Sequence, residues 1–368
     1  MDQSKAEADL QFMQMALELA SRATIATSPN PKVGCVIVKD GEVIGQGWTQ
    51  PVGQAHAEVQ ALRNATELGF DVDGATAYVT LEPCSHFGRT PPCAYALVEA
   101  GIARVVAAVQ DANPQVAGRG LAILRDAGIA VECGLLEPQA REMNRGFFKR
   151  METGKPWVRM KVAASLDGIT ALSNGQSKWI TADEARQDGH LWRSRADAIL
   201  TGIGTVLADD PQMNVRGVNT TRQPLKVVVD SDLRIAPEAK LLQDGTALVV
   251  CANTHPERQE LLQQKGAEIL CLPDDAAKVN LPELLLELGR RQINELHVEA
   301  GAKLNGALVA QNCVDELLIY LAPKLLGDGA GLFALPELSS VDQAKKVVFH
   351  EVVQVGETLR ILARFDSI

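Results

Sequence analysis

Long apolar runs, paired cysteines and an excess of positive charge are all missing from this chain of 368 residues. No run approaches the roughly 18 apolar residues that a membrane-spanning helix needs. The polar N-terminal segment MDQSKAEADL lacks the apolar core of a signal peptide, so we expect a cytoplasmic protein without a membrane partner. The net charge of −10 gives no general attraction to nucleic acid.

Cysteine is sparse, and its distribution argues against a secreted disulfide framework. The seven cysteines form an odd, scattered set. Four of them lie in or beside apolar runs that are typical of strands, where cysteine usually acts as a small hydrophobic residue. These four are Cys35, Cys133, Cys251 and Cys271. Cys84 and Cys93 differ because they flank a segment with histidine, arginine and proline, which raises the question of a metal site.

The pattern of elements indicates two α/β domains. A length of 368 residues exceeds the usual size of one hydrophobic core. Asp40-Gly41 is a favoured two-residue turn between apolar runs and predicts a β-hairpin over 33–48. Helices and strands then alternate on both sides of the polar segment KRMETGKPW, which implies layered α/β sheets. We expect a three-layer domain over residues 1–150 and a second α/β domain over 151–368.

Hydrophobic periodicity places the individual elements. In the first half it predicts helices over 11–25, 57–68, 94–100, 120–127 and 138–149, and strands over 75–81, 103–109 and 129–133. In the second half it predicts strands over 157–165, 196–202, 225–230, 246–252 and 295–300. Two long strand-like runs, 315–323 and 357–365, end the chain and are joined through KKVVFHEVVQVG.

Two short motifs bring possible metal ligands together. HAEVQALR begins at His56, and LEPCSHFGRTPPC contains Cys84 and Cys93. These three nitrogen and sulfur ligands leave the fourth position of a tetrahedral zinc open to water. Zinc lowers the pKa of that water to ~7, and Glu58 is placed to move protons between the water and a departing amine. We predict one zinc per chain and a catalytic carboxylate at Glu58.

The motif is similar to the HxE and PCxxC signature of zinc-dependent nucleobase deaminases. Here eight residues separate Cys84 from Cys93, where the signature has two, and this adds the loop SHFGRTPP beside the metal. His86 as a fourth ligand would close the site and leave Glu58 without a role. His86 and Arg89 are therefore interpreted either as residues on the substrate side of the loop or as solvent-exposed side chains.

Several longer stretches together resemble the bifunctional deaminase–reductase family of riboflavin biosynthesis. They are SPNPKVGCVIV, HAEVQALR, TLEPCSHFGRTPPC, NPQVAGRG, KVAASLDGIT, SKWIT, TVLADDP and VEAGAKLNGAL, and they cover nearly the whole chain. The resemblance implies a cytidine-deaminase-like domain that hydrolytically deaminates a diamino-pyrimidinone carrying a ribosylamino 5′-phosphate. It also implies a dihydrofolate-reductase-like domain that uses NADPH to reduce the ribosyl group to ribityl. We expect a homodimer or homotetramer.

The resemblance also assigns residues to the two sites. Asn30 and the hairpin would help to hold the pyrimidine ring. In the second domain, the substrate would contact Ser177, Arg193, Met213, Arg216 and Glu299. The cofactor would contact Ala163, Trp179, Thr205, Asp209, Ser231, Gly301, Ala302, Lys303, Leu304, Asn305, Gly306 and Ala307.

Physical chemistry adds to this assignment at a few positions. Arg193 and Arg216 suit a phosphate monoester because their forked donors bind it bidentately, although either is also compatible with a solvated surface charge. A helix that begins near Lys303 would offer backbone N–H groups to a phosphate, although the segment is also compatible with a helix that is simply entered through Gly301 and binds nothing. Lys161 is either a proton donor or substrate anchor, or a side chain that carries its charge to solvent. The segment GIGTVL has only the first two glycines of a dinucleotide fingerprint and predicts a tight turn after a strand.

Two other functions remain open from the sequence. The chain could be a deaminase whose C-terminal half only binds a ligand or mediates assembly, which an assay of NADPH oxidation with deaminated substrate would decide. It could also be a nucleic-acid deaminase that acts on tRNA and has a non-catalytic C-terminal domain. The acidic charge disfavours this second alternative, and salt-sensitive retention on RNA would support it.

Overall fold

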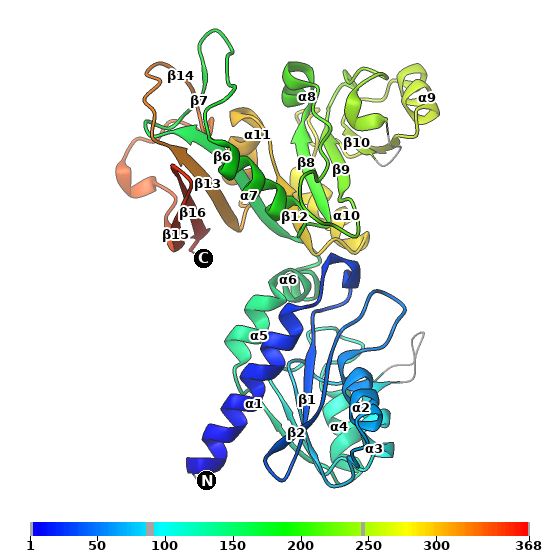
Figure 1. The fold of residues 1–368 in the computed structure, drawn as a ribbon. Helices are drawn as coiled ribbons and strands as arrows, with labels where there is room; N and C mark the ends of the chain where they lie inside the picture. The colour runs from blue at the N-terminus through cyan, green and yellow to red at the C-terminus, as the bar shows by residue number, and fades with distance from the viewer. Residues whose placement is uncertain (1–2, 86–91, 244–246, 367–368) are drawn as a thin grey trace. The chain divides into compact units, whose positions relative to one another are not determined.

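The computed structural model describes residues 3–85, 92–243 and 247–366. The chain divides into two compact units, Met1–Gly154 and Lys155–Ile368, whereas the sequence placed the division after residue 150. Each unit has its own sheet and its own helices (Figure 1). In the described part of the chain, no helix is both long and apolar enough to cross a membrane.

The described residues of the first unit form a five-stranded sheet in the order β2-β1-β3-β4-β5. Its strands are β1 (Gly34–Lys39), β2 (Glu42–Trp48), β3 (Thr76–Val79), β4 (Arg104–Ala107) and β5 (Ala130–Cys133). Its helices are α1 (Gln3–Ser21), α2 (Ala57–Glu67), α3 (Cys93–Glu99), α4 (Arg119–Asp126), α5 (Glu137–Met143) and α6 (Arg145–Thr153), with a short 3-10 turn, η1, at Ile25–Thr27. β1 pairs antiparallel with β2 and β3, and the remaining pairs are parallel.

The hairpin is confirmed, and one predicted helix is wrong. Asp40 and Gly41 have φ values of 53° and 82°, as a two-residue turn of this hand requires. The helix predicted over 138–149 is divided into α5 and α6 at Asn144. The side chain of Asn144 accepts a hydrogen bond from the N–H of Lys32 (2.7 Å) and donates one to its carbonyl oxygen (2.8 Å). This link to a distant segment breaks a helix that local periodicity predicts as continuous.

Helices α1 and α2 lie unusually close to the hairpin. A Cβ added at Gly34 would lie 1.9 Å from the carbonyl oxygen of Ala16 in α1, and one added at Gly47 would lie 2.3 Å from that of Ala57 in α2. Real Cβ atoms do not approach other atoms this closely, so backbone packs directly against backbone here. The start of α2, which follows His56, is fixed against the sheet as a result.

The described residues of the second unit form a nine-stranded sheet in the order β11-β10-β9-β8-β12-β6-β13-β16-β15, and β14 pairs with β7. The strands are β6 (Trp157–Ser165), β7 (Ile169–Leu172), β8 (Ala198–Gly202), β9 (Leu225–Val229), β10 (Ala247–Cys251), β11 (Glu268–Cys271), β12 (Glu295–Val298), β13 (Glu316–Ala322), β14 (Gly329–Gly331), β15 (Val347–Val355) and β16 (Thr358–Phe365). The helices are α7 (Asp183–Arg193), α8 (Ile203–Asp209), α9 (Pro256–Gln264), α10 (Leu281–Arg290) and α11 (Ala302–Ala310), with 3-10 turns η2 (Lys240–Leu242) and η3 (Val341–Gln343).

Two predictions for this unit are wrong. The segment read as a connection between the last two strands contains a strand of its own, β15, which forms the edge of the sheet beside β16. Its apolar side chains are either exposed (Val348, Phe349 and Val352) or only half-buried, so the sequence pattern gives little sign of a strand here. The tight turn predicted at 202–207 is instead the start of α8. Gly202 keeps an extended conformation (φ −104°, ψ 155°), and the helix begins directly after it.

The strand topology brings the carboxyl ends of several strands to one edge of the second sheet. The strands from β11 to β13 in the sheet order run parallel, so their carboxyl ends lie at the same edge. α8 follows β8 directly, and α11 follows the neighbouring β12 after a short segment. In open parallel sheets, ligands bind in the crevice outside these carboxyl ends.

Candidate active sites

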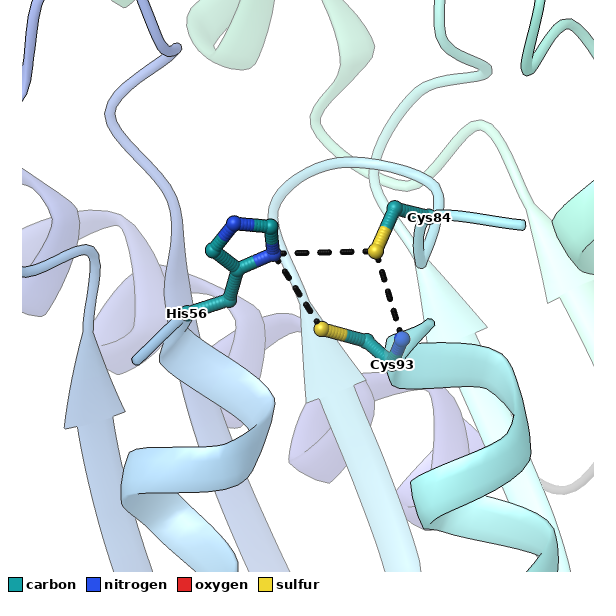
Figure 2. A group of neighbouring side chains, drawn as sticks. All are labelled: His56, Cys84 and Cys93. Atoms are coloured by element: carbon teal, nitrogen blue, oxygen red, sulfur yellow. Dashed lines mark hydrogen bonds between the residues drawn. The ribbon is translucent and has the colours of Figure 1, made fainter. Parts of the chain in front are cut away.

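The first site lies where two helices begin next to the end of a strand. His56 is the N-cap residue of α2, Cys93 is the first residue of α3, and Cys84 follows β3. Their side chains point toward one another (Figure 2). The three ligand atoms all lie within 4.8 Å of one another. The sequence prediction that these residues meet is supported by this arrangement.

The spacing of the three donors suits a zinc ion. The His56 Nδ1 atom lies 3.6 Å from the Sγ atom of Cys84 and 3.3 Å from that of Cys93. Zinc–sulfur and zinc–nitrogen bonds of about 2.3 and 2.0 Å at a tetrahedral angle place such donors about 3.6 Å apart. The residues present therefore fit a metal of this kind, with one position left for a further ligand.

The local electrostatics favour a thiolate at this point. The hydrogen bond from the Cys93 thiol, followed by one from the His56 ring, lowers the pKa of Cys84 to about 4. The backbone N–H of Cys93, at the start of α3, also donates to the Cys84 sulfur at 3.2 Å. Helix N-termini stabilise negative charge, and the thiolate is the form of cysteine that binds metals.

Glu58 lies in the first turn of α2, and only 3% of it is exposed. Burial, followed by the negative charge at Cys84, raises the pKa of Glu58 to about 7. Its carboxyl group interacts electrostatically with His56, Cys84 and Cys93, so the group lies near the three ligands. A carboxyl group of this kind can both take up and release a proton near neutral pH.

The other residues predicted for this site are placed less directly. Asn30 is half-buried, and its N–H donates to the carbonyl oxygen of Thr27 at 2.9 Å, just after η1. His86 and Arg89, interpreted as residues of the metal-side loop, lie outside the described residues. Asn30 therefore remains a predicted contact of the pyrimidine ring.

Glu82 is a residue that the sequence reasoning missed. It is 3% exposed, and within the described residues its carboxylate accepts four backbone N–H groups. The donors are Asp111 (3.0 Å), Gly118 (2.9 Å), Gly120 (2.8 Å) and Leu121 (3.3 Å). Because Glu82 precedes Cys84 by two positions, these bonds anchor the segment that carries a candidate metal ligand. Its position directly before Pro83-Cys84 was the signal in the sequence that could have identified it.

The second site is built around the half-buried carboxylate of Glu299, on the segment after β12. The guanidinium of Arg193, at the end of α7, donates to both oxygens of Glu299 at 2.5 and 2.9 Å. The Lys161 ammonium, on β6, lies 4.0 Å from Glu299, and His297 Nε2 lies 3.2 Å from it. The structure thus brings together three of the residues predicted for substrate or proton transfer: Lys161, Arg193 and Glu299.

The charges in this cluster are strongly coupled. Burial opposes the ionisation of Glu299, but Arg193 and Lys161 outweigh it and hold the pKa of this carboxyl well below its usual range. Burial lowers the pKa of Lys161, and the attraction of Glu299 only partly offsets this effect. An ammonium with a lowered pKa gives up its proton more easily than an ordinary lysine does.

Arg216 is placed differently from Arg193. It is exposed, and its guanidinium donates to Gln212 Oε1 at 3.0 Å and to the side-chain oxygen of Asn214 at 2.5 Å. Its backbone N–H donates to the ring of His190 at 3.2 Å. These contacts hold the arginine near the end of α7 while its charge stays accessible to a ligand. Met213 is 3% exposed and packs in a hydrophobic cluster below this segment.

The predicted cofactor residues gather at the carboxyl edge of the parallel strands. A Cβ on Gly301, the N-cap of α11, would lie 3.9 Å from the Thr205 hydroxyl of α8. A Cβ on Gly202 would lie 3.0 Å from the side chain of Leu304. These positions belong to the ends of the neighbouring strands β8 and β12, and Ser231 follows β9 on the other side of β8. Sequence positions up to about a hundred residues apart therefore share one edge.

The other residues predicted to contact the cofactor or the substrate lie next to the carboxyl edge of the sheet or stabilise the segments that form it. A salt bridge between Lys178 and Asp209 (2.8 Å) joins the segment of Trp179 to the end of α8, and Trp179 itself is 65% exposed. The buried side chain of Asn305 donates to the carbonyl oxygens of Ala300 (3.0 Å) and Leu332 (3.4 Å). Asn305 therefore shapes the start of α11 through internal hydrogen bonds. Ala163 and Ser177 are half-buried, and Ala302, Lys303, Gly306 and Ala307 belong to the first turns of α11.

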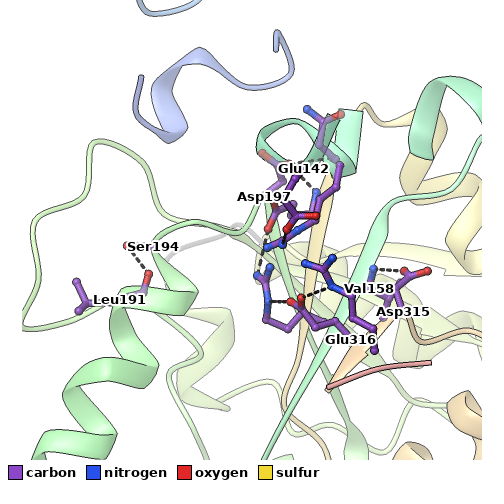
Figure 3. A network of polar contacts seen from close by, with 12 residues as sticks. Glu142, Val158, Leu191, Ser194, Asp197, Asp315 and Glu316 are labelled. Atoms are coloured by element: carbon purple, nitrogen blue, oxygen red, sulfur yellow. Dashed lines mark hydrogen bonds and ion pairs between the residues drawn. The ribbon is translucent and has the colours of Figure 1, made fainter. Parts of the chain in front are cut away.

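A buried ion network supports the strand that carries Lys161. Arg159, only 1% exposed, donates to Glu316 at 2.6 Å and to Glu295 at 3.1 Å. Figure 3 shows Glu316 within a network of polar contacts. The guanidinium of Arg159 lies 4.4 Å from the ring centre of Trp192. A buried charge persists in this way only when it is paired and hydrogen-bonded. The network fixes β6 against β12 and β13, and the sequence reasoning did not detect it.

Comparison with known proteins identifies both units. Residues 6–109 match the family model described as the cytidine and deoxycytidylate deaminase zinc-binding region, and residues 156–360 match the RibD C-terminal domain. The second match covers more than half of the chain. The chain belongs to the RibD family. The riboflavin biosynthesis protein RibD of Escherichia coli K12 is 48% identical over 361 residues, which are 95% of this chain and 97% of that protein.

Further RibD proteins are similar to this chain over nearly their full length. RibD of Haemophilus influenzae is 46% identical over 372 residues, with 96% of each chain covered. The structure of Acinetobacter baumannii RibD, form 1, is 44% identical with a TM-score of 0.90, covering 98% of this chain and 99% of that one. A Thermotoga maritima structure is 32% identical with a TM-score of 0.86 and the same coverage. That protein is named a diaminohydroxyphosphoribosylaminopyrimidine deaminase/5-amino-6-(5-phosphoribosylamino)uracil reductase.

These comparisons confirm the resemblance found in the sequence. The protein is a bifunctional deaminase and reductase of riboflavin biosynthesis, with a cytidine-deaminase-like domain and a RibD-type reductase domain. The reductase domain implies a nicotinamide cofactor. The two alternatives from the sequence, in which the C-terminal half is not catalytic, are therefore rejected.

Proposed function

We propose that the first unit removes an amino group from a diamino-pyrimidinone carrying a ribosylamino 5′-phosphate, in keeping with the deaminase name of the Thermotoga maritima protein. The observation that carries this proposal is the convergence of His56, Cys84 and Cys93 beside the buried Glu58. A zinc ion held by the three ligands would supply a water of lowered pKa to the site. The deaminase zinc-binding family model supports this metal.

Glu58 acts as the proton shuttle of the deamination. Its carboxylate takes a proton from the water as that water attacks the ring carbon, and it delivers a proton to the departing amine. Burial in the first turn of α2 keeps bulk water away from this carboxylate. Packing of α2 against the sheet at Gly47 holds the carboxylate in place relative to the ligands.

The second unit reduces the ribosyl group of the deaminated product to ribityl with NADPH. The residues at the carboxyl edge of the parallel strands would hold the cofactor, and the N–H groups at the start of α11 would bind one of its phosphates. Arg216 binds the phosphate of the substrate, and the cluster of Lys161, Arg193 and Glu299 holds the sugar. Lys161 is the proton donor proposed for this site, because burial lowers its pKa.

We also infer a cytoplasmic homodimer or homotetramer that binds neither nucleic acid nor membrane. The exposed apolar side chains of the edge strand β15 support an assembly of copies: Val348 is 48% exposed, Phe349 66% and Val352 55%. Unpaired edge strands with exposed apolar residues commonly pair with another chain. Light scattering of the purified protein tests the oligomeric state.

A two-step assay tests the proposed activities. The zinc-loaded protein is supplied with the diamino-pyrimidinone ribosyl phosphate, first alone and then with NADPH. Release of ammonia in the first step and oxidation of NADPH only in the second are expected. NADH in place of NADPH tests the cofactor preference, and transfer RNA in place of the pyrimidine tests the competing substrate class. Ammonia release from RNA without turnover of the pyrimidine would contradict the proposal.

A further inference from the structure

Two free cysteines of the second unit lie side by side. Cys251 ends β10 and Cys271 ends β11, and the two residues are register partners in this parallel pair of strands. Neighbouring strands lie about 4.7–4.9 Å apart. This spacing falls within the Cα separation of about 4.4–6.8 Å that a disulfide bridges. The backbones are therefore already at a distance that a disulfide can span.

Both thiols lie on the same face of the sheet. Val249 and Cys251 belong to one hydrophobic cluster, and Ile269, two residues before Cys271, packs against that cluster. Because side chains alternate between the faces of a strand, Cys271 also lies on this face. Its sulfur is 3.6 Å from the carbonyl oxygen of Ala252, the residue after Cys251. Burial, followed by the neighbouring Cys271, raises the pKa of the Cys251 thiol to about 11.

The two thiols differ in their access to solvent. Cys271 is exposed on β11, which forms an edge of the sheet. Cys251 is fully buried. A small oxidant can therefore reach Cys271 first, while Cys251 needs to reach only the sulfur beside it. Disulfides of intracellular proteins are usually transient or redox-sensing, so we expect the reduced pair to be the resting form.

The pair is connected to the edge of the sheet at which the cofactor is proposed to bind. The backbone N–H groups of Ala252 and Asn253, directly after Cys251, donate to the carbonyl oxygen of Ser231 at 3.0 and 2.9 Å. Ser231 is one of the residues assigned to the cofactor. A change in the position of the end of β10 therefore moves the backbone of Ser231.

We propose that Cys251 and Cys271 form a reversible dithiol–disulfide site that reacts with low-molecular-weight disulfides and weakens cofactor binding when it closes. The thiolate of Cys271 attacks oxidised glutathione, which releases one glutathione and leaves a mixed disulfide. The thiol of Cys251 loses its proton, attacks the Cys271 sulfur and displaces the second glutathione. Two protein thiols are oxidised, and one glutathione disulfide is reduced to two thiols. The effect on the cofactor rests on the proposed role of Ser231.

Peptide mapping tests the disulfide itself. The zinc-loaded, full-length protein is equilibrated with mixtures of reduced and oxidised glutathione, alkylated and digested with trypsin. Trypsin cuts after Arg258 and Lys265, so a disulfide joins two peptides that are otherwise separate. A joined peptide that dithiothreitol removes is expected, and Cys251→Ser should instead keep glutathione on Cys271. Glutathione on Cys271 of the wild type without any joined peptide would overturn the proposal, as would modification of the exposed Cys133 alone.

A binding measurement tests the coupling to the cofactor. NADPH is titrated by fluorescence into reduced and oxidised wild type, with Cys271→Ser treated identically as the control. Formation of the disulfide should raise the Kd for NADPH about two- to tenfold, which is the effect of weakening one neutral hydrogen bond. The Kd of the control should be the same before and after oxidation. A disulfide that forms without any change in Kd would refute the coupling. If the reduced protein does not bind NADPH, the proposed cofactor is wrong, and the peptide mapping still decides the dithiol site.

Discussion

Replacing Glu82 with glutamine should weaken the first unit and its hold on zinc while leaving the reductase intact. The carboxylate accepts four backbone N–H groups from residues 111–121, and it lies two positions before Cys84. A glutamine side chain keeps one acceptor oxygen and turns an NH₂ group toward the other two donors. Those two buried N–H groups then lose their partner.

The size of the effect follows from these lost partners. A buried donor left without an acceptor costs about 1–3 kcal/mol, so two such donors cost about 2–6 kcal/mol. A domain is stable by only about 5–15 kcal/mol in total. The unit should therefore fold but unfold at a lower denaturant concentration, and the segment with Cys84 should bind metal less tightly.

Two measurements on the same variant check this reasoning. Denaturant unfolding gives the loss of stability, and competition with a chelator gives the affinity for zinc. Glu99→Gln, the same chemical change at an exposed position of α3, is the matched control and should behave as the wild type. Wild-type stability together with wild-type zinc affinity in Glu82→Gln would refute an anchoring role. NADPH-dependent reduction of supplied deaminated substrate should be unchanged, which separates a local defect from general misfolding.

The remaining predictions concern the two sites directly. Cys84→Ser should abolish zinc binding and deamination, and full zinc occupancy measured by metal analysis would disprove the ligand assignment. Glu58→Gln should keep zinc but lose deamination by about 10²–10⁴-fold, whereas Glu67→Gln at the exposed end of α2 should show normal turnover. Arg216→Ala should lose about 1.5–3 kcal/mol of substrate binding, or one to two decades in the reductase KM, with the NADPH KM unchanged. A dephosphorylated substrate should show no such difference, and the exposed Arg290→Ala is the control. Removal of zinc with a chelator should stop ammonia release but not the reduction of deaminated substrate, and a parallel loss of both activities would contradict independent sites.

The features that could be predicted from the sequence depend on short-range patterns. The hairpin follows from Asp40-Gly41, and the metal-ligand set follows from two compact motifs that contain His56, Cys84 and Cys93. Short continuous apolar runs were sufficient to predict most strands of both sheets, because parallel strands that are buried on both faces are apolar along their whole length.

The features that could not be predicted depend on partners far away in the chain. The break between α5 and α6 arises from a contact of Asn144 with Lys32, 112 residues earlier. The anchoring of Glu82 and the pairing of Arg193 with Glu299 likewise need the tertiary fold. Individual charged residues give no periodic signal, so the sequence could nominate Arg193 and Glu299 as ligand contacts but not as partners of each other.

The direct contact of helix and strand backbones at Gly34 and Gly47 limits how this protein can be altered by directed evolution. Any side chain at Gly47 must displace α2, because its first carbon would lie 2.3 Å from a carbonyl oxygen of that helix. The same displacement would carry His56 and Glu58 away from the two cysteines together. A library that varies these glycines should therefore yield inactive members in nearly every case. Variation that changes substrate preference must come from the loops bordering the site, where a new side chain leaves the helix in place.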